Sequence, residues 1–493
     1  MSETAAILAF VALGVLLVTW IGIRGGSKAS STLEGWVLNS RLMGPVLVWF
    51  LLGTEIYTSF TFLGLAGFAY ARGGGVFYNV ATNDVAYAFG FFVLPAVWLI
   101  GRRFGYLTQA DFIAGRYGSQ GLGILVAAAS AVILIPYIDL NIQGLGAILK
   151  VVSGGALNLR LAEVIAFVVL AVAVYAGGIR GNAWQAVIKD VLMFVAIATL
   201  FVVVPLHFFG GFGAMMDKLG SAAAAHVVIP GHGSKVGVPW FISTVLLTGF
   251  GQWMWPQWFA VGFTAKGPRT LKLQAVFMPL YQVVKVAVIL IGFAAVLIFA
   301  GQKVPGNEVV MRLAERSFPG WFLAIFVLAA VLSAIVPAGS IIVTSCTLIA
   351  HNVVAKLRPA TSERAVFVLT RWLAFPVTLA ALLLAIAAPA LIVVILLVAY
   401  DFIAQLLPAV VIGGLFWRRA TLPGVVAGIL VGWGLSAYWL LTKHGPVLSL
   451  NSGLVALLAN IAVFVVVSLA TRPPEEKVVA PVMAAVWGSG RGT

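Results

Sequence analysis

The chain has 493 residues, of which 62% are hydrophobic and 9% are charged, and its mean hydropathy is +1.09. Soluble domains contain about 25% charged residues, so the composition excludes a soluble protein. A single cysteine excludes an internal disulfide scaffold. The net charge of +15 resides mostly between apolar runs, which argues against nucleic-acid binding.

Thirteen apolar segments follow one another along the chain, and most approach or exceed the about 20 residues that an α-helix needs to cross a bilayer. The first residues lack the basic region of a signal peptide, so we expect the first segment to stay in the mature protein. We predict a transmembrane helix for each segment: 4–23, 43–70, 78–101, 120–149, 161–179, 184–209, 238–262, 272–300, 319–350, 366–388, 390–416, 424–441 and 450–470.

The loop charges predict the orientation. If the N-terminus lies outside, the cytoplasmic loops hold about twice as many Lys and Arg residues as the outer ones, as the positive-inside rule requires. The longest loop, 210–237, is an external segment rich in Gly and Ala, too short for a separate domain. We therefore expect one membrane domain with its N-terminus outside and its C-terminus inside.

Several classes of function lack their motifs. No GxxxxGK[ST] loop occurs, so an ATP-driven pump is unsupported. Five scattered histidines and one cysteine predict neither a metal or haem site nor a membrane enzyme. No loop could hold a cytoplasmic signalling domain. A transporter or a channel remains.

Two segments are interrupted by residues that break helices. The second reads LLGTEIYTSFTFLGLAG and carries three glycines around a polar centre, and the seventh reads LLTGFGQWMWPQWFA with two glycines and Pro256. They are five spans apart, as an inverted five-plus-five repeat requires, and transporters often bind substrate where such helices unwind. Close packing of glycine-bearing helices is the alternative. The matched pair favours a carrier over a channel.

Charged residues at membrane depth are costly and indicate function by default. We single out Glu55, inside the first break, and Lys189, about one turn into the sixth segment. The alternatives are a structural carboxyl held by a neighbouring helix and a lysine that extends to the headgroups. Asp190 leaves the helix in another direction, so we do not expect adjacency to pair it with Lys189. The roles of four others stay open: Asp84, Asp139, Lys285 and Asp401.

Six short patterns occur in order along the chain: FLGLAGFAYARGG, YLTQADFIAGRYGS, PYIDLNIQGLG, YAGGIRGNAW, AAVLSAIVPAGS and GLFWRRATLPGVVAG. Together with the thirteen spans they resemble the sodium/solute symporter family over nearly the whole chain, most clearly over 30–420. The resemblance implies an all-α fold like that of the leucine transporter. It divides the chain into an extra N-terminal helix and loop, two inverted repeats, extra C-terminal helices and a cytoplasmic tail: 1–42, 43–209, 238–416, 417–471 and 472–493.

The resemblance also implies positions for the family's sodium site, on the backbone or side chains of Thr54, Tyr57, Ala330, Ser333 and Ala334. Residue 334 is Ala where the family usually has a hydroxyl, and an acid common in sodium-coupled members falls on Ala186. One turn later stands Lys189. Burial favours the neutral form of lysine, so we hypothesise that Lys189 replaces sodium as a fixed cation and couples transport to protons. Glu55 is a second candidate proton carrier.

Within the family, GTEIYTSFTFLG is most similar to carriers of short monocarboxylates, because its acid lies seven residues before Phe-Leu-Gly. The resemblance implies a monomeric symporter that imports pyruvate, lactate, acetate, propionate or alanine by alternating access, without a cofactor, in a bacterial cytoplasmic membrane. The alternative is sodium-coupled uptake of an amino acid such as proline or of another small organic solute. For the substrate pocket we expect Thr58, Ser59, Asn83, Tyr137, Gln252 and Trp253, although packing explains Tyr137 and Trp253 equally well.

Overall fold

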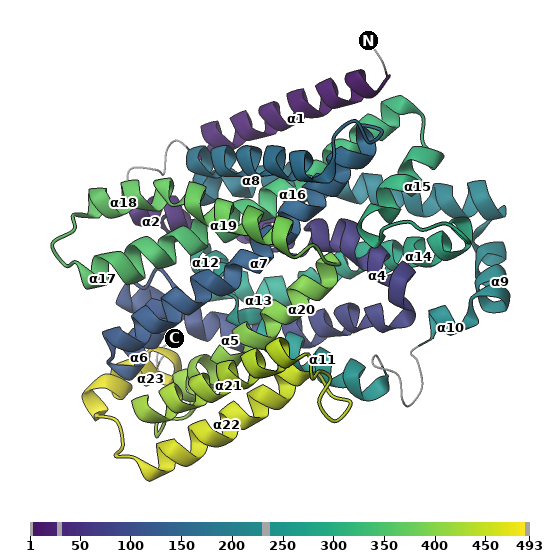
Figure 1. The fold of residues 1–493 in the computed structure, drawn as a ribbon. Helices are drawn as coiled ribbons and strands as arrows, with labels where there is room; N and C mark the ends of the chain where they lie inside the picture. Colours follow the sequence, from purple (N-terminus) through teal and green to yellow (C-terminus); the bar gives the residue numbers. More distant parts are fainter. Residues whose placement is uncertain (1–2, 27–31, 229–236, 489–493) are drawn as a thin grey trace.

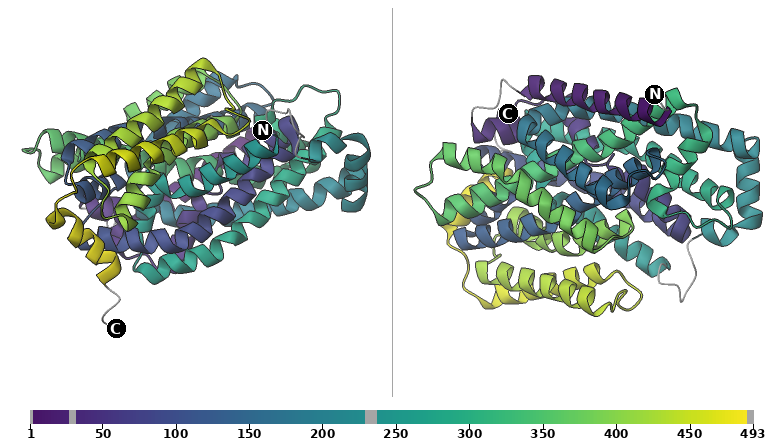
Figure 2. Two further views of the ribbon diagram at one scale, coloured as in Figure 1. Left: turned by 90° about the horizontal axis from the view of Figure 1, so that it is seen from below. Right: turned by 45° about the horizontal axis from the view of Figure 1, so that its top comes forward.

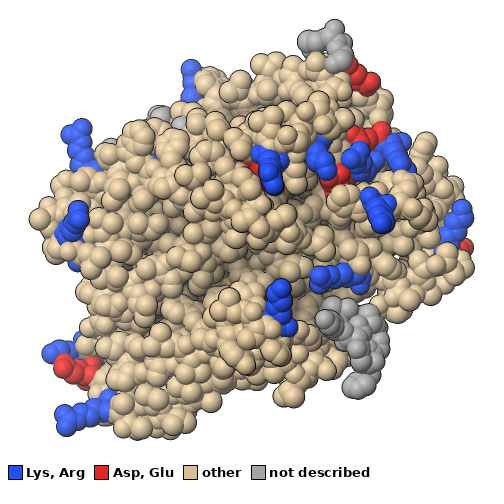
Figure 3. Space-filling view, viewed as in Figure 1, with Lys and Arg blue, Asp and Glu red and all other residues tan. Residues whose placement is uncertain are grey.

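The computed structural model describes residues 3–26, 32–228 and 237–488. In these ranges the regular structure is helical, and extended pairing is limited to two isolated β-bridges. Ten helical stretches there are long and apolar enough to cross a membrane. Charged side chains gather toward the left and right of Figure 3 and leave a broad belt of other residues between them. The described chain is therefore an all-α, multi-pass membrane protein.

The segment 33–209 begins with the short helix α2 (Leu33–Leu38) and contains the first break. Helix α3 (Pro45–Thr54) ends inside the membrane-depth run, and α4 (Leu65–Arg72) resumes after a π-helical turn. Then follow α5 (Tyr78–Phe104), the short α6 (Gln109–Tyr117) and α7 (Gln120–Val152). The predicted break in the second segment is thus present.

One element differs from the expected pattern. The structure joins the predicted spans 161–179 and 184–209 into α8 (Leu159–Phe209), a single helical element of 51 residues. At a rise of about 1.5 Å per residue this is more than twice the thickness of the about 30 Å hydrocarbon core. Helix α8 therefore holds enough helix for both predicted spans. The segment that follows, which the loop charges predict to be external, is partly helical, in α9 (Phe212–Ala222) and α10 (Ala224–Val227).

The second break lies between α11 (Val238–Gly251) and α12 (Pro256–Thr264), which a 3-10 turn connects. Helices α13 (Pro268–Phe277), α14 (Gln282–Ile298), α15 (Val309–Ser317) and α16 (Gly320–Thr347) follow. The remaining helices of this segment are α17 (Ala355–Leu357), α18 (Glu363–Trp372), α19 (Ala374–Ala387) and α20 (Ile392–Ile403).

The additional helices lie at the edges of the molecule. Helix α1 (Glu3–Gly26) packs along α8 and α16, whereas α21 (Leu422–Thr442) and α22 (Ser452–Ala470) pack on each other. Figures 1 and 2 place α1 and the α21–α22 pair on opposite sides of the fold. The short α23 (Glu476–Trp487) contacts α5 and α6.

Two groups of helices position the site. Helices α7, α8, α16 and α19 pack on one another, and α5 packs with α11 and α13 while α14 packs on α4. The broken helix α3–α4 lies between the groups, because α3 contacts α8 and α13 alike. Side chains from both groups can therefore reach its unwound backbone.

Candidate ion and substrate site

The first break exposes four successive backbone carbonyls, and side chains from other elements or from the next turn satisfy each of them. The Lys189 ammonium donates to the carbonyls of Thr54 and Tyr57, at 3.4 and 2.8 Å. The Tyr137 hydroxyl donates to the Glu55 carbonyl at 3.3 Å, and the Thr61 hydroxyl donates to the Ile56 carbonyl. The last carbonyls of a helix have no partner within the helix, and here the Lys189 ammonium bonds to two of them.

Lys189 is fully enclosed, with a relative exposure of 0%. Its three N–H donors face three acceptors, because Asp190 Oδ1 lies 2.6 Å from Nζ in addition to the two carbonyls. The ring of Tyr57 lies 5.9 Å from Nζ, at the outer limit of a cation–π contact. Lys189 therefore does not extend toward the membrane surface, and the alternative of a lysine that reaches the headgroups is wrong.

The expectation that Lys189 and Asp190 do not pair is also wrong. Adjacent residues leave a helix in different directions, yet the lysine chain is long enough for its ammonium to lie 2.6 Å from the Asp190 carboxylate. Burying either charge alone costs far more than bending a flexible chain, so the pair forms. The other carboxylate oxygen of Asp190 accepts a hydrogen bond from the Tyr281 hydroxyl at 2.8 Å.

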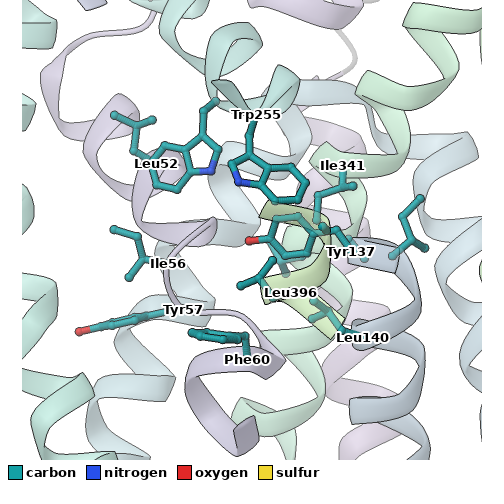
Figure 4. Packing of buried hydrophobic residues seen from close by; sticks show 14 of the residues in the cluster. Leu52, Ile56, Tyr57, Phe60, Tyr137, Leu140, Trp255, Ile341 and Leu396 are labelled. Atoms are coloured by element: carbon teal, nitrogen blue, oxygen red, sulfur yellow. The ribbon is translucent and has the colours of Figure 1, made fainter. Parts of the chain in front are cut away.

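Tyr281 links this ion pair to the broken helix. The Tyr57 hydroxyl donates to the Tyr281 carbonyl at 3.2 Å, and the two rings are 4.5 Å apart between centroids. A Cβ atom on Gly53 would overlap the Tyr281 hydroxyl, so only glycine leaves room for the ring. Gly53 therefore allows the Tyr281 ring to approach the backbone of α3 closely. Its neighbours Leu52, Ile56, Tyr57 and Phe60 follow the chain through the break in Figure 4.

Glu55 is buried on the other side of the break, with 3% exposure. The Ser340 hydroxyl of α16 donates to Glu55 Oε1, whereas Oε2 has no hydrogen-bond partner. The amide of Gln257 lies near this carboxyl, yet neither of its polar atoms has a partner of hydrogen-bonding geometry. The Ser59 hydroxyl is buried and unpartnered as well. Buried polar atoms are normally satisfied, so these atoms are candidate partners for a polar ligand.

The residues carried over from the sodium site separate into two sets. The carbonyls of Thr54 and Tyr57 hold the Lys189 ammonium, whereas the Ser333 hydroxyl donates to the Ala330 carbonyl at 2.7 Å within α16. Ala334 is fully buried and contributes no oxygen from its side chain. Whether these atoms form an ion site stays a prediction.

The residues expected to bind substrate fall into two groups. Thr58, Ser59 and Tyr137 lie at the first break, where the Tyr137 ring packs 5.0 Å from that of Trp255 (Figure 4). In the second group, the Trp253 indole donates to the Ala86 carbonyl at 2.6 Å. Trp253 therefore packs the second break against α5.

The other two residues of the second group are buried. Asn83 donates to the Tyr87 hydroxyl at 3.0 Å within α5. Gln252 is 3% exposed in the turn between α11 and α12.

The other charges at membrane depth have separate surroundings. Gln143 donates to Asp139 Oδ1 at 2.9 Å, and Lys285 donates to Asn79 Oδ1 at 2.8 Å. One carboxylate oxygen of Asp401 is buried without a partner, and Asp84 is exposed. Within the described residues, none of the four forms a hydrogen bond or an ion pair with Lys189 or Asp190.

A second polar cluster lies where the short loop helix α6 meets the π-helical turn that follows α16. His351 Nε2 lies 3.3 Å from Asp111 Oδ1, and Asn352 donates to the same oxygen at 2.7 Å. Burial alone would raise the pKa of the Asp111 carboxyl, but His351, the Leu107 amide and Asn352 together hold that pKa below its ordinary value. The cluster ties the loop helix to the scaffold.

Sequence reasoning missed several members of the site. It did not select Tyr281, Ser340 or Trp255, because their roles depend on contacts across more than 80 residues of sequence. Gln257 was noted only as part of the second break. The sequence did contain one clue, because Lys189 and Asp190 are neighbours in an apolar segment. Two opposite buried charges can form an ion pair with no net charge, which would have predicted their contact.

Comparisons with known proteins agree with the fold and with a transport role. The chain is 37% identical over 476 residues to the symporter YhjB of Bacillus subtilis, covering 93% of this chain and 96% of that protein. It is 30% identical over 458 residues to a monocarboxylate transport permease protein of Rhizobium johnstonii, covering 88% and 90%. A Na⁺-coupled sialic acid symporter in its outward-open state superposes with a TM-score of 0.77 at 14% identity, over 95% and 98% of the two chains.

The likeness to the sialic acid symporter shows the fold alone. The sequence relatives show more, since they extend over almost the full length of both chains. A family model for the sodium:solute symporters matches residues 36–432, which include both breaks and the Lys189–Asp190 pair. The chain is therefore a secondary transporter rather than an enzyme, and it belongs to the sodium:solute symporter family.

Proposed function

We propose that this symporter imports short monocarboxylates such as pyruvate, lactate, acetate, propionate and alanine. Support comes from the 30% identical monocarboxylate permease and from Glu55 in the motif GTEIYTSFTFLG. The first break also holds several buried polar atoms without a hydrogen-bond partner, which suits a polar solute. Pyruvate and lactate are the first substrates to test.

We further propose that protons drive the uptake through Lys189. The observation that carries this proposal is the position of the Lys189 ammonium, which occupies the Thr54 and Tyr57 carbonyls at the end of α3. A cation there satisfies the negative end of a helix, so the fixed ammonium replaces a diffusible one. Loss of a proton from the Lys189–Asp190 pair would release these carbonyls and let α3 move relative to α8.

Sodium coupling is the second candidate. The family's name and the sodium-coupled structural neighbour favour it. A sodium ion prefers several oxygen ligands, as hard cations do. In this chain Lys189 already occupies two of the proposed carbonyl ligands, and Ala334 lacks the hydroxyl of a third. Sodium would have to displace the ammonium or bind at another place.

The test is uptake of labelled pyruvate and lactate into proteoliposomes, with a proton gradient crossed against a sodium gradient. The proposal predicts accumulation with an inward proton gradient in the absence of sodium. Lys189→Gln should abolish proton-driven accumulation, while exchange of pyruvate across the membrane without a gradient continues. Uptake that requires sodium would overturn the coupling and leave the substrate intact. No uptake of either acid under any gradient would overturn the substrate.

A further inference from the structure

A second lysine is buried in the membrane without a charged partner. Lys285 is 3% exposed, and its ammonium donates to the neutral Asn79 Oδ1 at 2.8 Å. No carboxylate in the described part of the chain lies within ion-pair distance of it. Lys189, in contrast, has Asp190 at 2.6 Å. The fold therefore pairs Lys189 with a carboxylate and gives Lys285 only a neutral partner.

Lys285 faces a polar strip on α5. Asn79, Asn83 and Tyr87 are spaced by four residues and therefore share one face of that helix. Asn83 donates to the Tyr87 hydroxyl at 3.0 Å, while Asn79 accepts from Lys285. Gln282, at the start of α14, donates to the Val80 carbonyl at 2.8 Å and holds the two helices together at this level.

Lys285 also lies near a residue that contacts the first break. Lys285 lies four residues after Tyr281, the N-cap residue of α14, whose backbone is helical, so the two side chains project from the same side of the helix. Tyr281 binds Asp190 and packs on Tyr57, which belongs to the break. Lys285 therefore lies about one helical turn from the tyrosine that binds the Lys189–Asp190 pair.

The chemistry of Lys285 calls for an anion. An ammonium has three donors, and here a single amide oxygen takes one of them. Burying a cation with only a neutral partner is expensive, and an ionisable group in the membrane is expected to have a functional partner. A carboxylate supplies the opposite charge and two acceptor oxygens.

We propose that Lys285 binds the carboxylate group of the transported substrate, and that Asn79 positions its ammonium. The proposal rests on the monocarboxylate function proposed above and names the group that recognises the acid. Asn83, one turn from Asn79 on the same face, lies where it would contact the rest of a small substrate. Lys285 would then determine the selectivity of the transporter for carboxylates over neutral analogues.

Asp84 is the rival partner for Lys285. It is the carboxylate with the strongest electrostatic influence on Lys285, but its side chain is exposed and forms no ion pair with the lysine. A structural role for Lys285 through Asp84 would make Asp84→Asn behave like a change at the lysine itself. Asp84→Asn is therefore the matched control.

The experiment measures binding to the purified full-length protein by intrinsic tryptophan fluorescence. Pyruvate is compared with pyruvamide, a neutral molecule of nearly the same shape. The wild type should prefer pyruvate at least tenfold. Lys285→Gln should reduce this preference to near unity and Lys285→Arg should retain most of it, whereas Asp84→Asn should keep the wild-type ratio.

A further variant covers the case in which Lys285→Gln does not fold. Asn79→Asp keeps the lysine and supplies an internal carboxylate, so pyruvate should bind at least tenfold more weakly while thermal stability is retained. An unchanged pyruvate preference in Lys285→Gln, or an unchanged pyruvate affinity in Asn79→Asp, would overturn the inference and leave the proposed function standing. A wild type that binds neither pyruvate nor lactate would overturn both.

Discussion

The two broken helices differ in the groups that bond to the backbone carbonyls left without helical partners. At the first break, carbonyls of the unwound chain accept hydrogen bonds from Lys189 and Tyr137, which belong to other helices. At the second break the Trp255 amide bonds to the Gln252 carbonyl and the Trp258 amide to the Trp255 carbonyl. The Met254 carbonyl accepts from the neutral side-chain amide of Gln109 in α6 at 2.9 Å. A break whose carbonyls depend on a cation responds to that cation, whereas a break satisfied by neutral groups mainly packs aromatic rings.

The aromatic side chains support this contrast. At the second break Trp255 packs between the rings of Tyr137 and Tyr400, at 5.0 and 5.2 Å. Trp253 packs on Trp258 and bonds to α5. We therefore expect substitutions at the first break to alter coupling, and substitutions at the second break to alter stability or affinity with coupling intact.

The largest effect is expected from Lys189→Met. The change leaves Asp190 buried without its partner, and breaking a buried pair in this way costs about 3–5 kcal/mol. Thermal unfolding in detergent should show the loss, and proteoliposome uptake should be abolished. The double variant Lys189→Met with Asp190→Asn should recover most of the stability but none of the gradient-driven uptake. Full uptake by either variant would contradict the assignment.

Gly53→Ala should have the next largest effect. The new methyl group overlaps the Tyr281 hydroxyl, so the ring must move and release Asp190. A hydrogen bond to a charged group is worth about 1.5–3 kcal/mol, so the uptake rate should fall at least about tenfold. Gly44→Ala is the matched control, because a methyl group there meets no atom within 4 Å. Equal uptake by the two variants would count against the role of Tyr281.

Trp253→Phe tests the second break. It removes the hydrogen bond to the Ala86 carbonyl and keeps an aromatic ring, so the free energy of unfolding should fall by about 0.5–1.5 kcal/mol. The dependence of uptake on the proton gradient should stay as in the wild type. A shift of that dependence would show that the second break takes part in coupling.

The smallest effect is expected at the Asp111 cluster. Because the folded state lowers the pKa of Asp111, its contribution to stability is present above the ordinary pKa and is lost as the pH falls through the lowered value. Thermal stability should therefore decline on acidification, and Asp111→Asn should flatten this decline by about 1.5 kcal/mol, the worth of a charged hydrogen bond. If thermal stability depended on pH in the same way in the variant and the wild type, Asp111 would not cause the decline.

Much of the fold follows from local patterns in the sequence. Hydropathy locates the membrane helices, and the glycines and Pro256 locate both breaks, because these features act over a few residues. The join of two predicted spans into α8 was not foreseen, since hydropathy reports burial in lipid and not the continuity of a helix.

The site was harder to predict than the fold. Lys189 and the carbonyls of Thr54 and Tyr57 were expected to meet, because the family resemblance placed a cation site on those carbonyls and Lys189 one turn after the missing acid. The pairing with Asp190 was missed, since helix geometry gives the direction in which a side chain leaves and not where a long chain ends. Tyr281 and the Lys285–Asn79 contact depend on how α14 packs, which no local pattern specifies.

The most direct test of the central claim asks whether the first break holds sodium at all. Purified wild-type protein is heated in detergent with increasing sodium chloride, and choline chloride serves as the control for ionic strength. We expect the same melting temperature in both salts, because the Lys189 ammonium already occupies the Thr54 and Tyr57 carbonyls. A saturable rise of the melting temperature with sodium alone would contradict it.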